Sequence, residues 1–125
     1  MKKILLGFLV ITAFMSCEKE VLDPSYGIEG RWLWSPSENR ADANTMYEFK
    51  DGNVYKFYCI VCPADDDYWM SLDSTDRIPG ADTYTLSGDT LVWDGISFGI
   101  TFECDGGELL FTNGNHLWRL SSNCQ

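Results

Sequence analysis

The residues of this chain that could carry chemistry include a closely spaced pair of cysteines. Cys59 and Cys62 have the two-residue spacing of a thiol redox pair. Such pairs react when a helix N-terminus stabilises the first thiolate, whereas this motif follows an expected strand. A zinc site would also need Cys104 and Cys124, which are isolated in the sequence. We therefore expect these four cysteines to form structural disulfides.

The pairing of the four cysteines is left open by the sequence. An even number of cysteines in a small exported domain favours disulfides, and four cysteines allow three pairings. A bond from Cys124 to Cys59 or Cys62 would close the longest loop and tie down the C-terminus. We favour this pairing over the alternatives.

The single histidine and a run of aspartates are the other candidates. Any Ser-His or Cys-His mechanism must use His116. No nucleophile-elbow sequence accompanies it, and the neighbouring turn 113–115 indicates a surface position. The run 65–67 offers oxygen ligands for calcium but lacks the spaced pattern of a dedicated calcium loop. We therefore expect a protein that is not an enzyme and that has no metal or cofactor.

Aromatic side chains beside long connections are the candidates for binding. Exposed aromatic faces stack on sugars or line the entrance of an apolar pocket. Trp34 and Trp69 adjoin the two longest connections, 35–44 and 62–81, and binding residues concentrate in such segments. The alternative for these side chains is partial burial beneath the loops. The candidate ligand contacts are Trp34, Tyr68, Trp69 and Trp93.

The elements that must position these residues are short β-favouring runs separated by turn signals. Pairs such as Asp51-Gly52 and Asp94-Gly95 supply the positive φ values of tight hairpins. No helical period longer than two turns is evident, so we predict an all-β antiparallel up-and-down meander. The predicted strands are Ile28–Trp34, Thr45–Lys50, Asn53–Ile60, Asp82–Ser87, Thr90–Asp94, Ile96–Cys104, Glu108–Thr112 and His116–Ser121.

Strict alternation shows which side of a strand faces the core. Phe98, Ile100 and Phe102 alternate with small or polar residues, which gives one apolar face. About eight such strands hide their edges best by closing into a barrel, and a β-sandwich is the alternative. We expect 35–44 to be a loop or a helical turn, and 68–72 to be a short edge strand or part of a long loop.

Charge and length exclude several classes of partner. The chain has 125 residues and a formal charge of −10, with 19 acidic and 9 basic residues. Such a chain is repelled by phosphate backbones and by anionic lipid surfaces. The length suits one domain, and nucleic acid is not an expected partner.

The N-terminus resembles a bacterial lipoprotein signal peptide. Lys2 and Lys3 precede an apolar run, 4–14, that is too short to span a bilayer, and Ser16 precedes Cys17. We expect 1–16 to be cleaved, 17–27 to be a lipidated cysteine and tether, and 28–125 to be the folded domain. Lipid on Cys17 would anchor the protein to the cell envelope, with the outer membrane and its outer surface as the expected location.

Two motifs resemble the lipocalin-like barrels, and in particular the compact lipocalin-like lipoproteins of bacteria. Gly30-Arg31-Trp32 opens the first strand, and Leu117-Trp118-Arg119-Leu120 lies in the last. The resemblance implies a barrel in which Gly30 and Trp32 lie at the closed end and Arg119 packs over the Trp32 ring. A guanidinium over an indole face gains cation–π attraction, which supports that role.

The expected barrel is shallow, because its strands are short. Its interior is either filled by side chains or open as a small apolar pocket at one mouth. We expect a non-catalytic lipoprotein that binds a small apolar or amphipathic ligand at the mouth. The alternatives are an accessory module that contacts glycan or an envelope protein through 62–81, and a thiol oxidoreductase using Cys59 and Cys62.

Overall fold

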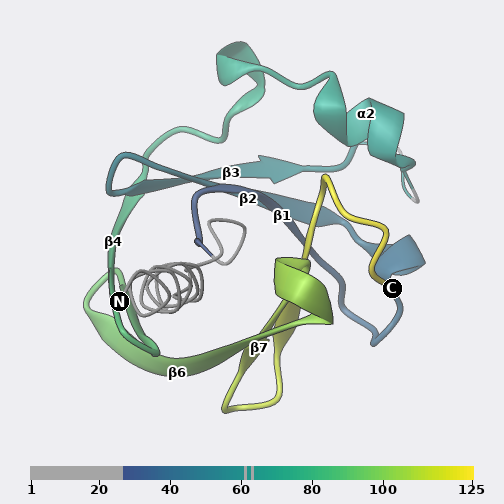
Figure 1. Ribbon diagram of the computed structural model, residues 1–125. Helices are drawn as coiled ribbons and strands as arrows, with labels where there is room; N and C mark the ends of the chain where they lie inside the picture. Colours follow the sequence, from purple (N-terminus) through teal and green to yellow (C-terminus); the bar gives the residue numbers. More distant parts are fainter. Residues whose placement is uncertain (1–26, 61, 63) are drawn as a thin grey trace, which may run out of the picture.

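The computed structural model describes residues 27–60, 62 and 64–125. Eight antiparallel strands follow one another in sequence order and close into a barrel (Figure 1). The all-β meander and the closed barrel predicted from the sequence are confirmed, and the sandwich alternative is wrong. The strands are β1 (Gly30–Trp34), β2 (Thr45–Lys50), β3 (Asn53–Tyr58), β4 (Asp82–Ser87), β5 (Thr90–Trp93), β6 (Ile96–Glu103), β7 (Glu108–Phe111) and β8 (His116–Arg119).

The predicted leader, Cys17 and most of the tether lie outside the described residues. Among residues 27–60, 62 and 64–125, no helix has the length and apolar character needed to cross a membrane.

The register shows where the barrel wall is strong and where it is weak. The β1–β2 ladder pairs every residue of β1, and β8 closes the barrel by pairing Arg119 with Trp32. The β3–β4 ladder consists of two pairs, Asn53 with Thr83 and Val54 with Asp82. The ladder ends at Val54, and beyond it Lys56 of β3 accepts a hydrogen bond from the Ile78 backbone N–H at 2.9 Å.

The connection 62–81 contains a short helix where we expected a loop or an edge strand. Helix α2 (Asp66–Met70) begins after Asp65, whose side chain accepts a hydrogen bond from the Tyr68 backbone N–H at 2.9 Å. Asp73 and Asp76 form a capping box around the 3-10 helix η3 (Ser74–Asp76). The expectation of a strand at 68–72 was wrong, because these aspartates satisfy the orphan N–H groups at helix starts.

The barrel interior holds one apolar cluster. Alternate residues of every strand point inward, as the parity of β6 predicted for Phe98, Ile100 and Phe102. Aromatic rings meet edge to face within it, as in Phe49 and Tyr84, whose centroids lie 5.0 Å apart. The fully or nearly fully buried members are Ile28, Trp32, Phe49, Val54, Leu91, Ile100, Leu109, Phe111 and Leu117.

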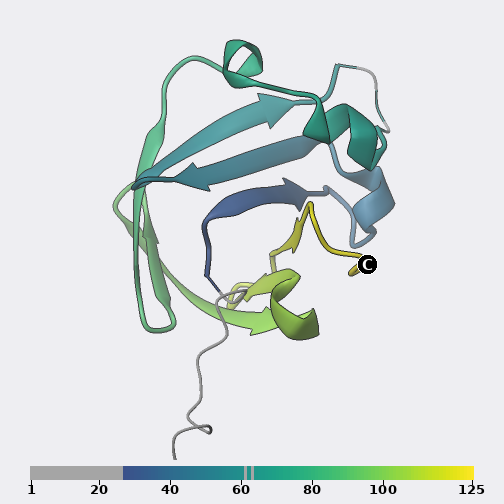
Figure 2. The same cartoon turned by 45° about the horizontal axis from the view of Figure 1, so that its top comes forward.

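A second apolar cluster lies on the outer face of the barrel. The segment containing α2 lies outside β3 (Figure 2). Trp69 of this helix packs into the outer cluster with 0% exposure. Arg31 fastens the segment by donating to the backbone carbonyls of Trp69 at 3.2 Å and Leu72 at 3.0 Å. The buried members are Leu33, Ala43, Met46, Phe57, Trp69 and Leu120.

Trp69→Ala should lower the free energy of unfolding by about 3–5 kcal/mol, because it leaves a large cavity between α2 and the barrel wall. Urea unfolding followed by circular dichroism measures the change. Met70→Ala is the matched control, since Met70 is 55% exposed in the same helix. Its effect should stay within about 0.5 kcal/mol. Equal effects of the two substitutions would contradict the burial of Trp69.

Candidate functional site

The two ends of the barrel differ in chemistry. In an up-and-down meander, the starts of β1, β3, β5 and β7 lie at one end and their last residues lie at the other. We call the end near Gly30 and Arg119 the closed end. The opposite end, near Trp34, Tyr58 and Trp93, is the open end.

Arg119 covers the closed end. Its guanidinium carbon lies 4.2 Å from the centroid of the Trp32 ring. The same group donates to the carbonyls of Gly106 at 3.1 Å and Glu29 at 3.0 Å, and to that of Gly27. Burial lowers the pKa of Arg119. This contact is the one that the lipocalin-like resemblance implied.

The geometry also explains the glycine of the Gly-x-Trp motif. Gly30 has a φ of 125°, in the region that side chains rarely adopt. A Cβ atom placed there would lie 3.2 Å from Nη1 of Arg119. Gly30 therefore lets the backbone pass beneath the guanidinium while Trp32 donates through Nε1 to the Ile28 carbonyl at 2.9 Å.

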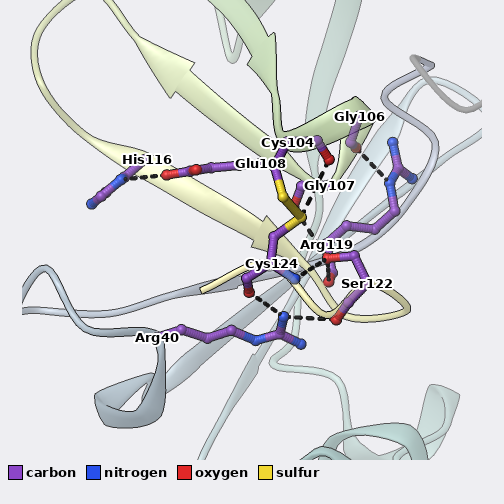
Figure 3. The surroundings of a disulfide bond; sticks show 9 residues. All are labelled: Arg40, Cys104, Gly106, Gly107, Glu108, His116, Arg119, Ser122 and Cys124. Atoms are coloured by element: carbon purple, nitrogen blue, oxygen red, sulfur yellow. Dashed lines mark hydrogen bonds and ion pairs between the residues drawn. A yellow bond between two sulfur atoms is a disulfide. The ribbon is translucent and has the colours of Figure 1, made fainter.

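The disulfides correct our favoured pairing. Cys104 is bonded to Cys124, and Cys59 is bonded to Cys62. Cys124 follows β8, which ends at the closed end beside the β6–β7 connection that contains Cys104 (Figure 3). Cys59 follows β3 and lies at the open end. The favoured bond from Cys124 to Cys59 or Cys62 is wrong: the segment after β8 lies against the 104–107 connection, where Cys124 meets Cys104, and Cys59 closes a local loop with Cys62.

A buried arginine holds the C-terminal segment in place. Arg40 donates through Nη1 to the carbonyls of Ser122 at 2.8 Å and Cys124 at 2.7 Å (Figure 3). It also forms an ion pair with Asp66 at 3.3 Å. The sequence analysis missed this role, because nothing local to Arg40 indicates what it contacts.

The open end holds a cluster of polar and aromatic side chains. Lys56 Nζ lies 3.3 Å from Asp82 Oδ2, and Trp93 Nε1 donates to the same oxygen at 3.0 Å. The Tyr47 ring meets the Trp93 ring edge to face, with centroids 4.8 Å apart. Tyr47 is also the ladder partner of Lys56. We call these four residues the mouth cluster.

The surroundings of the mouth cluster shift the pKa of Tyr47. Burial raises the pKa of this phenol, and the neighbouring Tyr58 and Asp82 raise it further. Tyr47 is therefore a neutral hydroxyl at physiological pH. The mouth cluster consequently offers one ammonium, one carboxylate and one hydroxyl beside aromatic faces.

Apolar side chains at the rim of the open end are left uncovered. Tyr58 and Ile96 share the inward parity of their strands, yet each is 59% exposed. One hollow of about 440 Å³ adjoins Tyr58 and Cys59. Another, of about 210 Å³, is lined by Lys56, Asp82 and residues 78–81, which precede β4. The open end therefore presents an apolar rim and recesses beside the mouth cluster.

The four aromatic residues proposed as ligand contacts divide into two pairs. Trp34 and Trp93 are half-buried and pack against the inner cluster. Tyr68 and Trp69 belong to the outer cluster instead. Trp69 does not have the exposed position that we expected, because its ring fills the space between α2 and the barrel wall.

The sequence analysis missed most of the mouth cluster. The signal was the parity of the strands, since a charged residue at position 56 alternates with Val54 and Tyr58. Asp82 opposes Val54 in the register and so shares its side of the sheet. A charge at an inward position near a strand end is the pattern that would have identified these residues.

The remaining candidates for chemistry were the single histidine and the possible metal ligands. His116 Nδ1 lies 3.0 Å from Glu108 Oε2 (Figure 3). The ring centroids of His116 and Trp118 lie 4.4 Å apart. Among residues 27–60, 62 and 64–125, no three His, Cys, Asp or Glu side chains gather as a metal site.

Comparisons of the chain with family models, curated proteins and solved structures gave no match.

Stability should fall as the pH rises from about 10 to about 12, because Tyr84 resists ionisation in the folded state. Burial and a 2.9 Å hydrogen bond to Glu29 raise the pKa of Tyr84 to about 12. An unfolded tyrosine ionises near pH 10, so only the unfolded state gains from losing the proton in this window. The contribution is fully present below pH 10.

Tyrosinate absorbance and urea unfolding across this range measure the effect. Tyr84→Phe should flatten the pH dependence of stability, and Glu29→Gln should let Tyr84 ionise earlier. A Tyr84→Phe protein with the wild-type pH dependence would refute this account.

Proposed function

We propose that this protein is an exported, lipid-anchored, non-catalytic binding protein that holds a small apolar or amphipathic ligand at the open end of its barrel. The observation that carries the proposal is the asymmetry between the ends. Arg119 covers one end with a guanidinium and several hydrogen bonds. At the other end, Tyr58 and Ile96 have inward parity and are exposed to solvent.

Exposed apolar rims favour binding for a physical reason. Leaving apolar area in water costs about 25 cal/mol per Å², and a ligand that covers the rim recovers that free energy. The half-buried rings of Trp34 and Trp93 extend the apolar surface toward the interior. Ligand sites commonly combine such walls with a few polar groups, and the mouth cluster supplies those groups.

Membership of the lipocalin-like superfamily is part of the proposal. A closed eight-stranded antiparallel barrel, Gly30 beneath a guanidinium and Arg119 over Trp32 all support it. Within this proposal, lipid on Cys17 anchors the domain to the envelope, probed by the second experiment below.

A neutral apolar dye such as N-phenyl-naphthylamine should bind saturably and gain fluorescence. Ile96→Asp should weaken its binding by at least about tenfold, because a charge in the rim must be desolvated when the dye binds. Met70→Asp is the matched control, since Met70 is a similarly exposed apolar residue outside the barrel. It should leave dye binding unchanged. Absence of dye binding, or equal losses in both variants, would overturn the proposal.

Cys17→Ser should move the protein from the membrane fraction to a soluble fraction when the full chain is expressed in a bacterium with an outer membrane. A serine cannot carry the thioether-linked lipid that anchors the chain. Cys62→Ser is the control, because it removes a different cysteine and should leave the protein with the membranes. Membrane association that survives Cys17→Ser would refute the anchor.

A further inference from the structure

We propose that the mouth cluster selects a neutral sugar ring, such as a terminal pyranose of a glycan. This inference rests on the proposed function and names the chemical class of its ligand. It is carried by the combination of a cation, an anion and aromatic faces at one place: Lys56, Asp82, Tyr47 and Trp93.

The charged pair requires a ligand that both donates and accepts hydrogen bonds. Lys56 offers an ammonium, which only donates, and Asp82 offers a carboxylate, which only accepts. An anionic ligand that meets Lys56 is repelled by Asp82 only 3.3 Å away, and a cationic ligand meets the converse problem. Vicinal hydroxyls satisfy both partners, because each hydroxyl donates and accepts. Hydrogen bonds to charged groups are also the stronger ones.

The aromatic walls suit the other face of such a ring. Tyr47 and Trp93 meet edge to face, so the two rings present surfaces in different directions. Trp93 is held in orientation by its hydrogen bond to Asp82 and by an edge-to-face contact with Phe49, whose ring centroid lies 5.1 Å away. The C–H face of a pyranose packs on such rings, whereas its hydroxyls face the polar groups.

The depth of the barrel excludes a long acyl chain. The layer beneath the mouth cluster is filled by Trp32, Phe49 and Val54, each no more than 1% exposed. The hollow beside Lys56 and Asp82 measures about 210 Å³, which is below the range of pockets for larger ligands. This hollow, which is lined by Lys56, Asp82 and residues 78–81, has room for a compact ring.

The net charge of the whole chain also disfavours anionic ligands. With a formal charge of −10, the protein repels anionic amphiphiles at long range. A neutral sugar is not affected by this field. The field and the local pair together favour an uncharged ligand.

Isothermal titration of the folded domain with methyl glycosides of glucose, galactose, mannose and N-acetylglucosamine tests the inference. At least one should bind at millimolar concentrations and change the tryptophan fluorescence. Asp82→Asn and Lys56→Met should each weaken that binding by about tenfold or more, because each removes a charged partner. The matched controls are Asp67→Asn and Lys50→Met, which remove the same charges from exposed positions away from the mouth cluster.

Each outcome decides the matter. Sugar binding that both mouth variants weaken and both controls retain supports the inference. Dye binding without sugar binding overturns the sugar class and leaves the proposed function standing. Sugar binding that is unaffected by both mouth variants overturns the site, and absence of both dye and sugar binding overturns the proposed function as well. Should Asp82→Asn fail to fold by circular dichroism, Lys56→Met alone decides between these outcomes.

Discussion

The packing of one guanidinium over one indole determines how the rest of this barrel is organised. Arg119 joins the last strand to the first, covers the Trp32 ring and binds three carbonyls from two separate segments. Removing part of a cation from water is tolerated only when its donors are satisfied, and this requirement fixes the backbone around the half-buried Arg119. Gly30 must have no side chain, and residues 27–29 must fold across the barrel end. The closed end is thereby determined, and under the proposed function the ligand binds at the opposite end.

The barrel alone would be a small core, and the outer cluster enlarges it. Short strands of four to eight residues enclose little volume, so a second apolar layer between α2 and the wall adds burial that the interior cannot supply. Arginines fasten this layer: Arg31 binds carbonyls of the covering segment, and Arg77 stacks on Tyr55 while pairing with Glu48. The acidic, aromatic connection 62–81 is therefore mainly a structural cover.

The strands could be predicted from the sequence because their signals are local. Alternation and turn pairs such as Asp51-Gly52 specified the meander, and the motif around Trp32 specified the barrel closure. The disulfide pairing, the burial of Trp69 and the mouth cluster depend on which distant segments meet. Lys56, for example, forms its ion pair with Asp82, which lies 26 positions later, and no local sequence pattern links the two residues. The helix at 66–70 was missed because aspartate caps were interpreted as loop residues.

One of the two shortest ladders of the barrel wall lies beside its polar interior. β3 and β4 share two ladder pairs, and beyond them Lys56 and Asp82 face each other beside a hollow. A partly exposed ion pair contributes little to stability, about 0–1 kcal/mol, so this pair is a poor substitute for the missing ladder. A well-paired apolar wall would stabilise the domain more. Under the proposed function, recognition accounts for this arrangement, because the short ladder leaves charged groups exposed that a longer ladder would cover. The closed end thus provides the stability that lets the open end remain incompletely packed.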